Sequence, residues 1–314
     1  VAVIVAEPYK MIIYDGDNPD LPMWMVFNGQ NAGGYLGYGI GAGRALSSVV
    51  ALNGSIHTGG LVGNWATTIN FITELGTGVG VGSTVTSHTQ IVNRNTASDL
   101  TTVSTTKSLV NGIINDLAIT VLPNAPIDAD TGLPVPTLAA ATDGGVSVIK
   151  DDGSVVDITS TSHSSANQIN FTKENQLSFY NAPHYSLAIQ DIPTSDETGL
   201  GSIFSNSEFR YTSYDVVGSP NLVGDSSAGS ALCHTHTPNF EVVTGSASGM
   251  TSIQRVPDAP LTGLSNYIAS DFNTGWMNGD IKLATLSDTD DTNVTGSELV
   301  SQTASGWTLP TGFS

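Results

Sequence analysis

Two histidines beside the single cysteine form the group of residues best suited to metal chemistry. The segment reads Cys233-His234-Thr235-His236, and on a strand the side chains of His234 and His236 point to the same face. Two imidazoles on one face can share a metal ion, and three subunits around a three-fold axis can each supply such a pair to one iron. The alternative is a pair of histidines hydrogen-bonded within an inner strand. His57 is expected at a comparable position on an inner strand, so a further interpretation is a channel lined by histidines.

Carboxylates gather in turns, where they offer the oxygen ligands that calcium prefers. None of these turns matches the twelve-residue calcium loop that ends in glutamate. Aspartate is also common in turns because its side chain mimics part of a turn. Calcium binding and plain turn formation are therefore both open interpretations. The acidic turns contain Asp15, Asp17 and Asp20; Asp128 and Asp130; and Asp288, Asp290 and Asp291.

Three tryptophans, Trp24, Trp65 and Trp276, are candidates for stacking on sugar rings. The competing interpretation is that these side chains pack between neighbouring sheets. The sequence therefore favours packing residues, with a carbohydrate-binding set as the functional alternative.

Catalytic motifs are not met anywhere in the sequence. Asp225–Gly229 departs from the G-x-S-x-G pattern of a serine nucleophile, and Gly76–Gly82 lacks the Gly-Lys-Ser/Thr ending of a phosphate-binding loop. The few arginines make an arginine triad for sialic acid improbable. We therefore expect no enzymatic activity, and no cofactor beyond the calcium or iron considered above.

Composition excludes several classes of partner. The 314 residues include 9 lysines and arginines against 28 aspartates and glutamates, a formal net charge of −19, which repels nucleic-acid phosphates and anionic membranes. Only 12% of residues are charged, but 39% are hydrophobic, which is enough for a folded core. No stretch of about 18 apolar residues is present, so we expect no membrane-spanning helix. A single cysteine excludes an intrachain disulfide.

The segment Thr137–Ser160 is the clearest guide to the fold. Leu138–Thr142 is small and apolar, as a strand buried on both faces must be. Turns at Asp143-Gly144-Gly145 and at Asp151-Asp152-Gly153 separate it from two runs that alternate apolar with polar residues. The segment therefore predicts a three-stranded antiparallel meander, which is too small to be stable alone.

Imperfect copies of this meander recur roughly 40 to 70 residues apart, a spacing typical of β-repeat proteins. They predict an all-β fold, a propeller-like ring of about five antiparallel blades with a range of five to seven. Met11–Tyr14 or Met23–Phe27 should close the ring against Asn266–Leu286, because closure removes exposed sheet edges. We place the ring in residues 1–287 and a connector, or the start of another domain, in residues 288–314. The copies are Val49–Thr73, Ala166–Ile192, Leu222–Ile253 and Asn266–Ser287.

One region has some helical character. It lies within Leu100–Leu117 and reads SLVNGIINDL, although its glycine and β-branched residues weaken a helix.

Three runs of sequence resemble bacteriophage tail-fibre and related virion structural proteins. They are YDGDNPDLPMWMVF, NDLAITVLPNAPIDADTGLPVPTLAAATDGGVSVIKDDGSVVDI and NTGWMNGDIKLATLSDTDDTN. The resemblance implies a virion or extracellular location, a homo-oligomer, other fibre subunits as partners, and host-surface carbohydrate as a ligand. It carries over no functional residues. We interpret the chain as a piece of a longer protein.

Two alternatives to this role stay open. One is a secreted glycan-binding or carbohydrate-active propeller of cellular origin. The other is a structural spacer in a fibre or filament that binds nothing itself.

Overall fold

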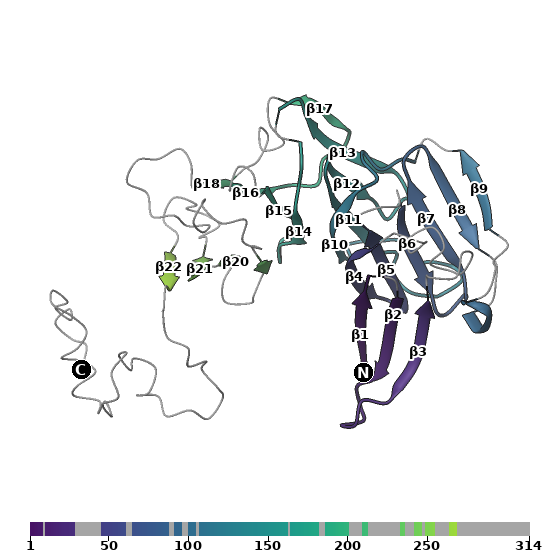
Figure 1. Cartoon of the computed structure of the whole chain (residues 1–314). Coiled ribbons are helices and arrows are strands. Elements are labelled where there is room, and N and C mark those ends of the chain that lie inside the picture. The colour runs from purple at the N-terminus through teal and green to yellow at the C-terminus, as the bar shows by residue number, and fades with distance from the viewer. Residues whose placement is uncertain are drawn as a thin grey trace, which may run out of the picture. The chain divides into compact units, whose positions relative to one another are not determined.

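A computed structural model gives the structure of the chain (Figure 1). Contacts divide the chain into two compact units, Val1–Tyr267 and Ile268–Ser314. The predicted boundary between residues 287 and 288 falls within the second unit, outside the described residues. The structure describes residues 1–8, 10–28, 45–60, 65–87, 91–95, 100–104, 107–162, 164–181, 186–200, 209–212, 233–235, 242–246, 249–254 and 264–268.

The described residues form an all-β fold, as the sequence predicts. They contain 22 strands and one short 3₁₀ turn, η1 (Ile91–Asn93). No helix among these residues is long and apolar enough to cross a membrane. The strands assemble into five sheets that follow one another along the chain, except that one strand of the third sheet comes after strands of the fourth.

The sheets contain three to six strands each. The first sheet, purple in Figure 1, comprises β1 (Ala2–Glu7), β2 (Lys10–Asp15) and β3 (Met23–Asn28). The second comprises β4 (Leu46–Leu52), β5 (Ser55–Gly60), β6 (Trp65–Asn70), β7 (Gly76–Gly80), β8 (Ser83–Ser87) and β9 (Leu100–Ser104). The third comprises β10 (Ile114–Thr120), β11 (Thr137–Thr142), β12 (Gly145–Ile149), β13 (Val155–Ser160) and β17 (Glu197–Leu200). The fourth comprises β14 (Gln168–Phe171), β15 (Leu177–Asn181), β16 (Ser186–Gln190) and β18 (Phe209–Thr212), and the fifth β19 (Cys233–Thr235), β20 (Val242–Ser246), β21 (Gly249–Gln254) and β22 (Leu264–Ile268).

The meander predicted within Thr137–Ser160 is confirmed as β11, β12 and β13. The register pairs Ala140 with Ser147, and every residue of β11 is buried, as its small side chains require between two sheets. Strand β10 extends the sheet on one side, and the parallel strand β17 extends it on the other. β17 reaches this sheet after the chain has passed through β14, β15 and β16, and the chain then returns to the fourth sheet as β18.

The turn between β11 and β12 depends on one glycine more than on the other. Gly145 has a φ of +138°, whereas Gly144 is not among the residues with positive φ. Thr142 closes the turn, because its Oγ1 donates to the Gly145 carbonyl at 2.8 Å and accepts from the Gly144 N–H at 3.2 Å. A Cβ at Gly145 would lie 2.1 Å from the Ile158 carbonyl oxygen of β13. Gly145 therefore allows β12 to approach β13 closely.

The N-terminal strands differ from the prediction. Val1–Tyr14 forms two strands, β1 and β2, and these pair with β3 in a sheet of their own. Since β2 has a partner on each side, Met11–Tyr14 has no free edge for a strand from Asn266–Leu286. Met23–Phe27 lies in the edge strand β3, but most of its predicted partner falls outside the described residues.

Successive sheets contact one another through their first strands. β1 contacts β4, β4 contacts β10, β10 contacts β14, and β14 contacts β19. This serial contact of first strands is the arrangement expected of innermost strands in propeller blades. The described sheets are therefore propeller-like, while ring closure and blade number stay predictions.

Apolar cores fill the spaces between neighbouring sheets. Met11 and Phe27 of the first sheet pack with Ile69 of the second. Leu117 and Leu138 of the third sheet pack against the second, with Ala66. The largest core lies between the third and fourth sheets, and it includes Val146, Val148, Ile158, Phe171, Leu177 and Phe179. The first four sheets thus bury apolar faces against their neighbours, as sheets of this size need in order to be stable.

A buried carboxylate joins three of the first strands. Asp116 of β10 accepts hydrogen bonds at Oδ1 from the Ser48 hydroxyl (2.9 Å) and from the Leu117 N–H (2.9 Å). Its Oδ2 accepts from the Ile169 N–H of β14 at 3.1 Å. Burial raises the pKa of Asp116, and these three hydrogen bonds oppose the rise. The second, third and fourth sheets therefore share one acceptor group.

We predict that Gly145→Ala lowers the free energy of unfolding by about 2 kcal/mol or more, because it adds strain at positive φ and a clash with the backbone of β13. Gly132→Ala is the matched control, since Gly132 also has positive φ (+69°) but open space around its Cα. That variant should lose only about 1–2 kcal/mol, the cost of the left-handed conformation. Urea unfolding measures both, and equal losses would contradict the close approach at Gly145.

We predict that Asp116→Asn lowers the free energy of unfolding by about 1–3 kcal/mol, because the amide nitrogen must face a backbone or hydroxyl donor. Asp128→Asn is the control: Asp128 also accepts from backbone N–H groups, those of Asp130 and Thr131, but in an exposed turn. It should be the milder change in urea unfolding. A larger loss of unfolding free energy for Asp128→Asn would show that the hydrogen bonds of Asp116 do not hold the three sheets together.

Candidate functional site

An exposed tryptophan of the first sheet lies against an aromatic pair that links it to the second sheet. The Trp24 side chain of β3 is 61% exposed and stacks on Phe71, with ring centroids 6.2 Å apart and planes 26° apart. Phe71 follows β6 and meets the buried Phe27 edge-on at 6.1 Å. The Arg94 guanidinium lies 5.7 Å from the Phe27 ring centre. Trp24 is therefore held in place by one face and leaves the other accessible.

An apolar groove of about 340 Å³ opens beside this aromatic stack. One wall is the first sheet, and the opposite wall is the turn between β4 and β5. Asn53 and Gly54 form that turn with φ values of 50° and 71°, as an Asn-Gly hairpin requires. The Asn53 amide donates to the Pro134 carbonyl at 2.8 Å and anchors the turn. The larger apolar side chains of the lining are Ile4, Ile13, Trp24, Leu52, Ile56 and Phe71.

The three candidate tryptophans do not form one described platform. Trp65 begins β6, whereas Phe71, the partner of Trp24, comes directly after the other end of that strand. The length of β6 therefore separates them, roughly 20 Å at 3.3 Å per residue. Trp276 lies outside the described residues. Phe71 is the residue that sequence reasoning missed, because nothing local to it indicates a partner 47 positions earlier.

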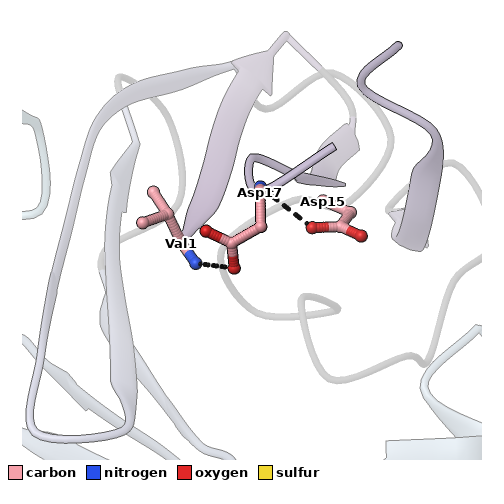
Figure 2. Close-up of polar contacts among 3 residues, drawn as sticks. All are labelled: Val1, Asp15 and Asp17. Carbon is pink, nitrogen blue, oxygen red and sulfur yellow. Dashed lines mark hydrogen bonds and ion pairs between the residues drawn. The ribbon is translucent and has the colours of Figure 1, made fainter. Parts of the chain in front are cut away.

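The N-terminal carboxylates serve their own turn (Figure 2). Asp15 Oδ1 accepts from the Asp17 N–H at 3.0 Å, and the α-amino group of Val1 lies 2.5 Å from Asp17 Oδ2. The Asp20 N–H donates to the Asn18 side chain at 3.0 Å. The bonds from the Asp17 and Asp20 N–H groups are those of Asx turns. Within the described ranges, no group of three histidine, cysteine, aspartate or glutamate side chains has metal-binding geometry.

The histidine segment is described in part. Cys233, His234 and Thr235 form β19, in which His234 pairs with Thr244 of β20. His236 lies outside the described residues, so the predicted iron site stays a prediction. β19 is the first strand of its sheet.

His57 does not line an open channel. It lies on β5, the second strand of its sheet, and only 5% of the residue is exposed. Its Nδ1 is 2.9 Å from the Thr68 hydroxyl, and its Nε2 has no hydrogen-bond partner. Burial lowers the pKa of His57 from 6.5 to about 4. The side chain is therefore a neutral, buried part of the second sheet.

Comparison with known proteins shows no established family. No family model matches the chain, and no curated protein matches it. Among solved structures, a protein from Lactobacillus plantarum is 11% identical over 85% of this chain and 65% of its own, with a TM-score of 0.43. The Malassezia sympodialis allergen Mala s 1 is 11% identical over 86% and 75%, with a TM-score of 0.42. YCF48 bound to a D1 peptide is 11% identical over 80% and 77%, with a TM-score of 0.38.

We predict that His57 makes stability depend on pH between about 6.5 and 4. The unfolded state binds the proton at higher pH than the folded state, so the stabilisation is complete above pH 6.5 and is lost as pH falls towards 4. The loss amounts to about 3 kcal/mol at full titration. Urea unfolding from pH 8 to 4 of the wild type and of His57→Asn measures it.

The variant should lack this component, while the titration of carboxylates remains in both proteins and cancels in the difference. At pH 8, where His57 is neutral in both states, the difference in free energy of unfolding between the two proteins should reflect only packing and the contact with Thr68. The same pH dependence in both proteins would contradict the assignment.

Proposed function

We propose that the chain is a structural adhesion segment of a virion fibre, and that it binds neutral carbohydrate on a host surface through Trp24. The observation that carries the carbohydrate part is the Trp24 ring: it is largely exposed, yet fixed on Phe71 beside the apolar groove. An exposed apolar side chain held rigidly beside a groove is typical of a binding surface. The virion part rests on the resemblance of the sequence alone.

Carbohydrate suits this surface because a sugar ring has a face of C–H groups as well as hydroxyls. The C–H face can lie on the indole, while the hydroxyls point to water or to the rim. Since Phe71 already orients the indole, little conformational entropy is lost when the ligand binds. The groove accepts an apolar substituent of the sugar better than another hydroxyl, because its lining is mainly apolar.

Charge selects among carbohydrates. The formal net charge of −19 repels sialylated and sulfated glycans at long range, which favours neutral ones. The low charge content and the extensive β-structure suit a rigid display segment in an oligomeric fibre. The proposed role is binding and display, without catalysis.

We predict that Trp24→Ala reduces binding to the neutral glycans recognised on a glycan array by at least tenfold, equivalent to about 1.4 kcal/mol. Met23→Ala is the matched control, because Met23 is also 61% exposed and does not line the groove. It should bind like the wild type. Binding measured with the full 314-residue chain in oligomeric form retains avidity.

Two results would contradict the proposal. If Trp24→Ala binds glycans as tightly as the wild type, Trp24 is not part of the binding site. If the wild type binds no glycan, the spacer role is favoured. Immunogold electron microscopy of virions tests the location separately. Labelling of fibres supports the virion role, and its absence favours the secreted propeller of cellular origin.

A further inference from the structure

A polar cavity of about 350 Å³ lies where the chain leaves the fourth sheet and joins the third. Residues 190–195 and Glu197 line it. These residues connect the end of β16 to β17, the strand that pairs in parallel with β13. The cavity is therefore at the connection that leads the chain from the fourth sheet into the third.

Gln190 contributes a buried acceptor that has no partner. The residue is only 2% exposed, and its Nε2 donates to Glu197 Oε2 at 3.2 Å. The carboxylate fixes the orientation of the amide, because the opposite orientation would place two acceptors together. Gln190 Oε1 then has no hydrogen-bond partner, which is unfavourable for a buried carbonyl oxygen.

Two carboxylates share the wall of this cavity. Asp191 Oδ1 accepts from Gln176 Nε2 at 2.9 Å, and Glu197 Oε2 accepts from Gln190. Each carboxylate therefore keeps a second oxygen for another ligand. Within the described part of the chain, no lysine, arginine or histidine forms an ion pair with either group.

The neighbouring charges are also negative. Asp196 Oδ1 accepts from the Asp157 N–H at 3.0 Å. Burial raises the pKa of Asp157, and the negative charge of Asp196 adds to the rise. This corner of the two sheets is therefore rich in negative charge without a described counter-charge.

We propose that this cavity binds a calcium ion through Gln190 Oε1 and the carboxylates of Asp191 and Glu197, with backbone oxygens and water completing the shell. Calcium accepts six to eight oxygen ligands, including amide carbonyls, in irregular geometry. Magnesium suits the cavity less well because it demands near-ideal octahedral geometry. The ion coordinates the buried Gln190 oxygen, offsets the negative charge of the neighbouring carboxylates and stabilises the pairing of β17 with β13.

Isothermal titration calorimetry of the full chain with calcium chloride tests the site. We expect a dissociation constant of about 0.1–1 mM, the range of extracellular calcium modules. Glu197→Gln should weaken binding at least tenfold, because it removes a charged ligand. Glu174→Gln is the matched control, since Glu174 lies outside the cavity and contacts Lys173 at 3.4 Å. It should bind calcium like the wild type.

Gln190→Glu provides a second test that does not depend on loss of binding. An additional carboxylate beside Glu197 should lower the melting temperature in EDTA, and calcium should restore it. Sodium chloride at matched ionic strength should restore it less, since screening alone does not supply a ligand. This variant therefore links calcium to stability at the position of the unpaired oxygen.

Three results would overturn the proposal. They are no calcium binding by the wild type up to 10 mM, equal binding by Glu197→Gln and the wild type, and an equal effect of magnesium on melting. The second result would place calcium at another acidic turn. None of these outcomes bears on glycan binding at Trp24, which lies on the first sheet.

Discussion

Asp116 occupies the first strand of the third sheet, and its carboxylate accepts from groups of the second, third and fourth sheets. Such a group sets the mutual register of the first strands, because one carboxylate can satisfy all three donors only when β4, β10 and β14 are aligned. Ser47 adds a parallel tie, its hydroxyl donating to the Ile114 carbonyl at 2.5 Å. Apolar contacts hold the sheets together without specifying alignment, whereas these polar contacts specify it.

The alignment explains which residues each sheet can use. β11 must be small because it is covered on both sides, by the second sheet through Leu138 and Ala140 and by the fourth through Ala139 and Ala141. Gly59 of β5 follows the same constraint, since a Cβ there would lie 2.5 Å from Ile114 Cγ2 of the third sheet. Cohesion between sheets therefore depends on close packing of small residues, consistent with a chain in which few residues are charged.

Local chemistry made much of the fold predictable. The Asn53-Gly54 turn, the meander within Thr137–Ser160 and the strands of Ala166–Ile192 follow from short-range rules of turn and alternation. Non-local pairing was not predictable: β17 joins the third sheet from beyond the fourth, and Val1–Tyr14 folds back on itself as β1 and β2. The segment of helical character ends inside β10, to which it contributes Ile114–Leu117, because burial against neighbouring sheets outweighs a weak helical pattern. Trp24 was identifiable by type, but its support by Phe71 required the tertiary structure.

Both proposed ligand sites lie where two sheets meet at the end of a core. Ile4, Ile13 and Phe71 pass from the core between the first two sheets into the wall of the apolar groove. Ile192 packs against the core between the third and fourth sheets and also lines the polar cavity. Twisted sheets diverge at their ends, so the space between them widens where connecting segments emerge. Those segments can vary in chemistry because the cores behind them already supply stability. The same architecture therefore supports an aromatic surface at one junction and an acidic cavity at another.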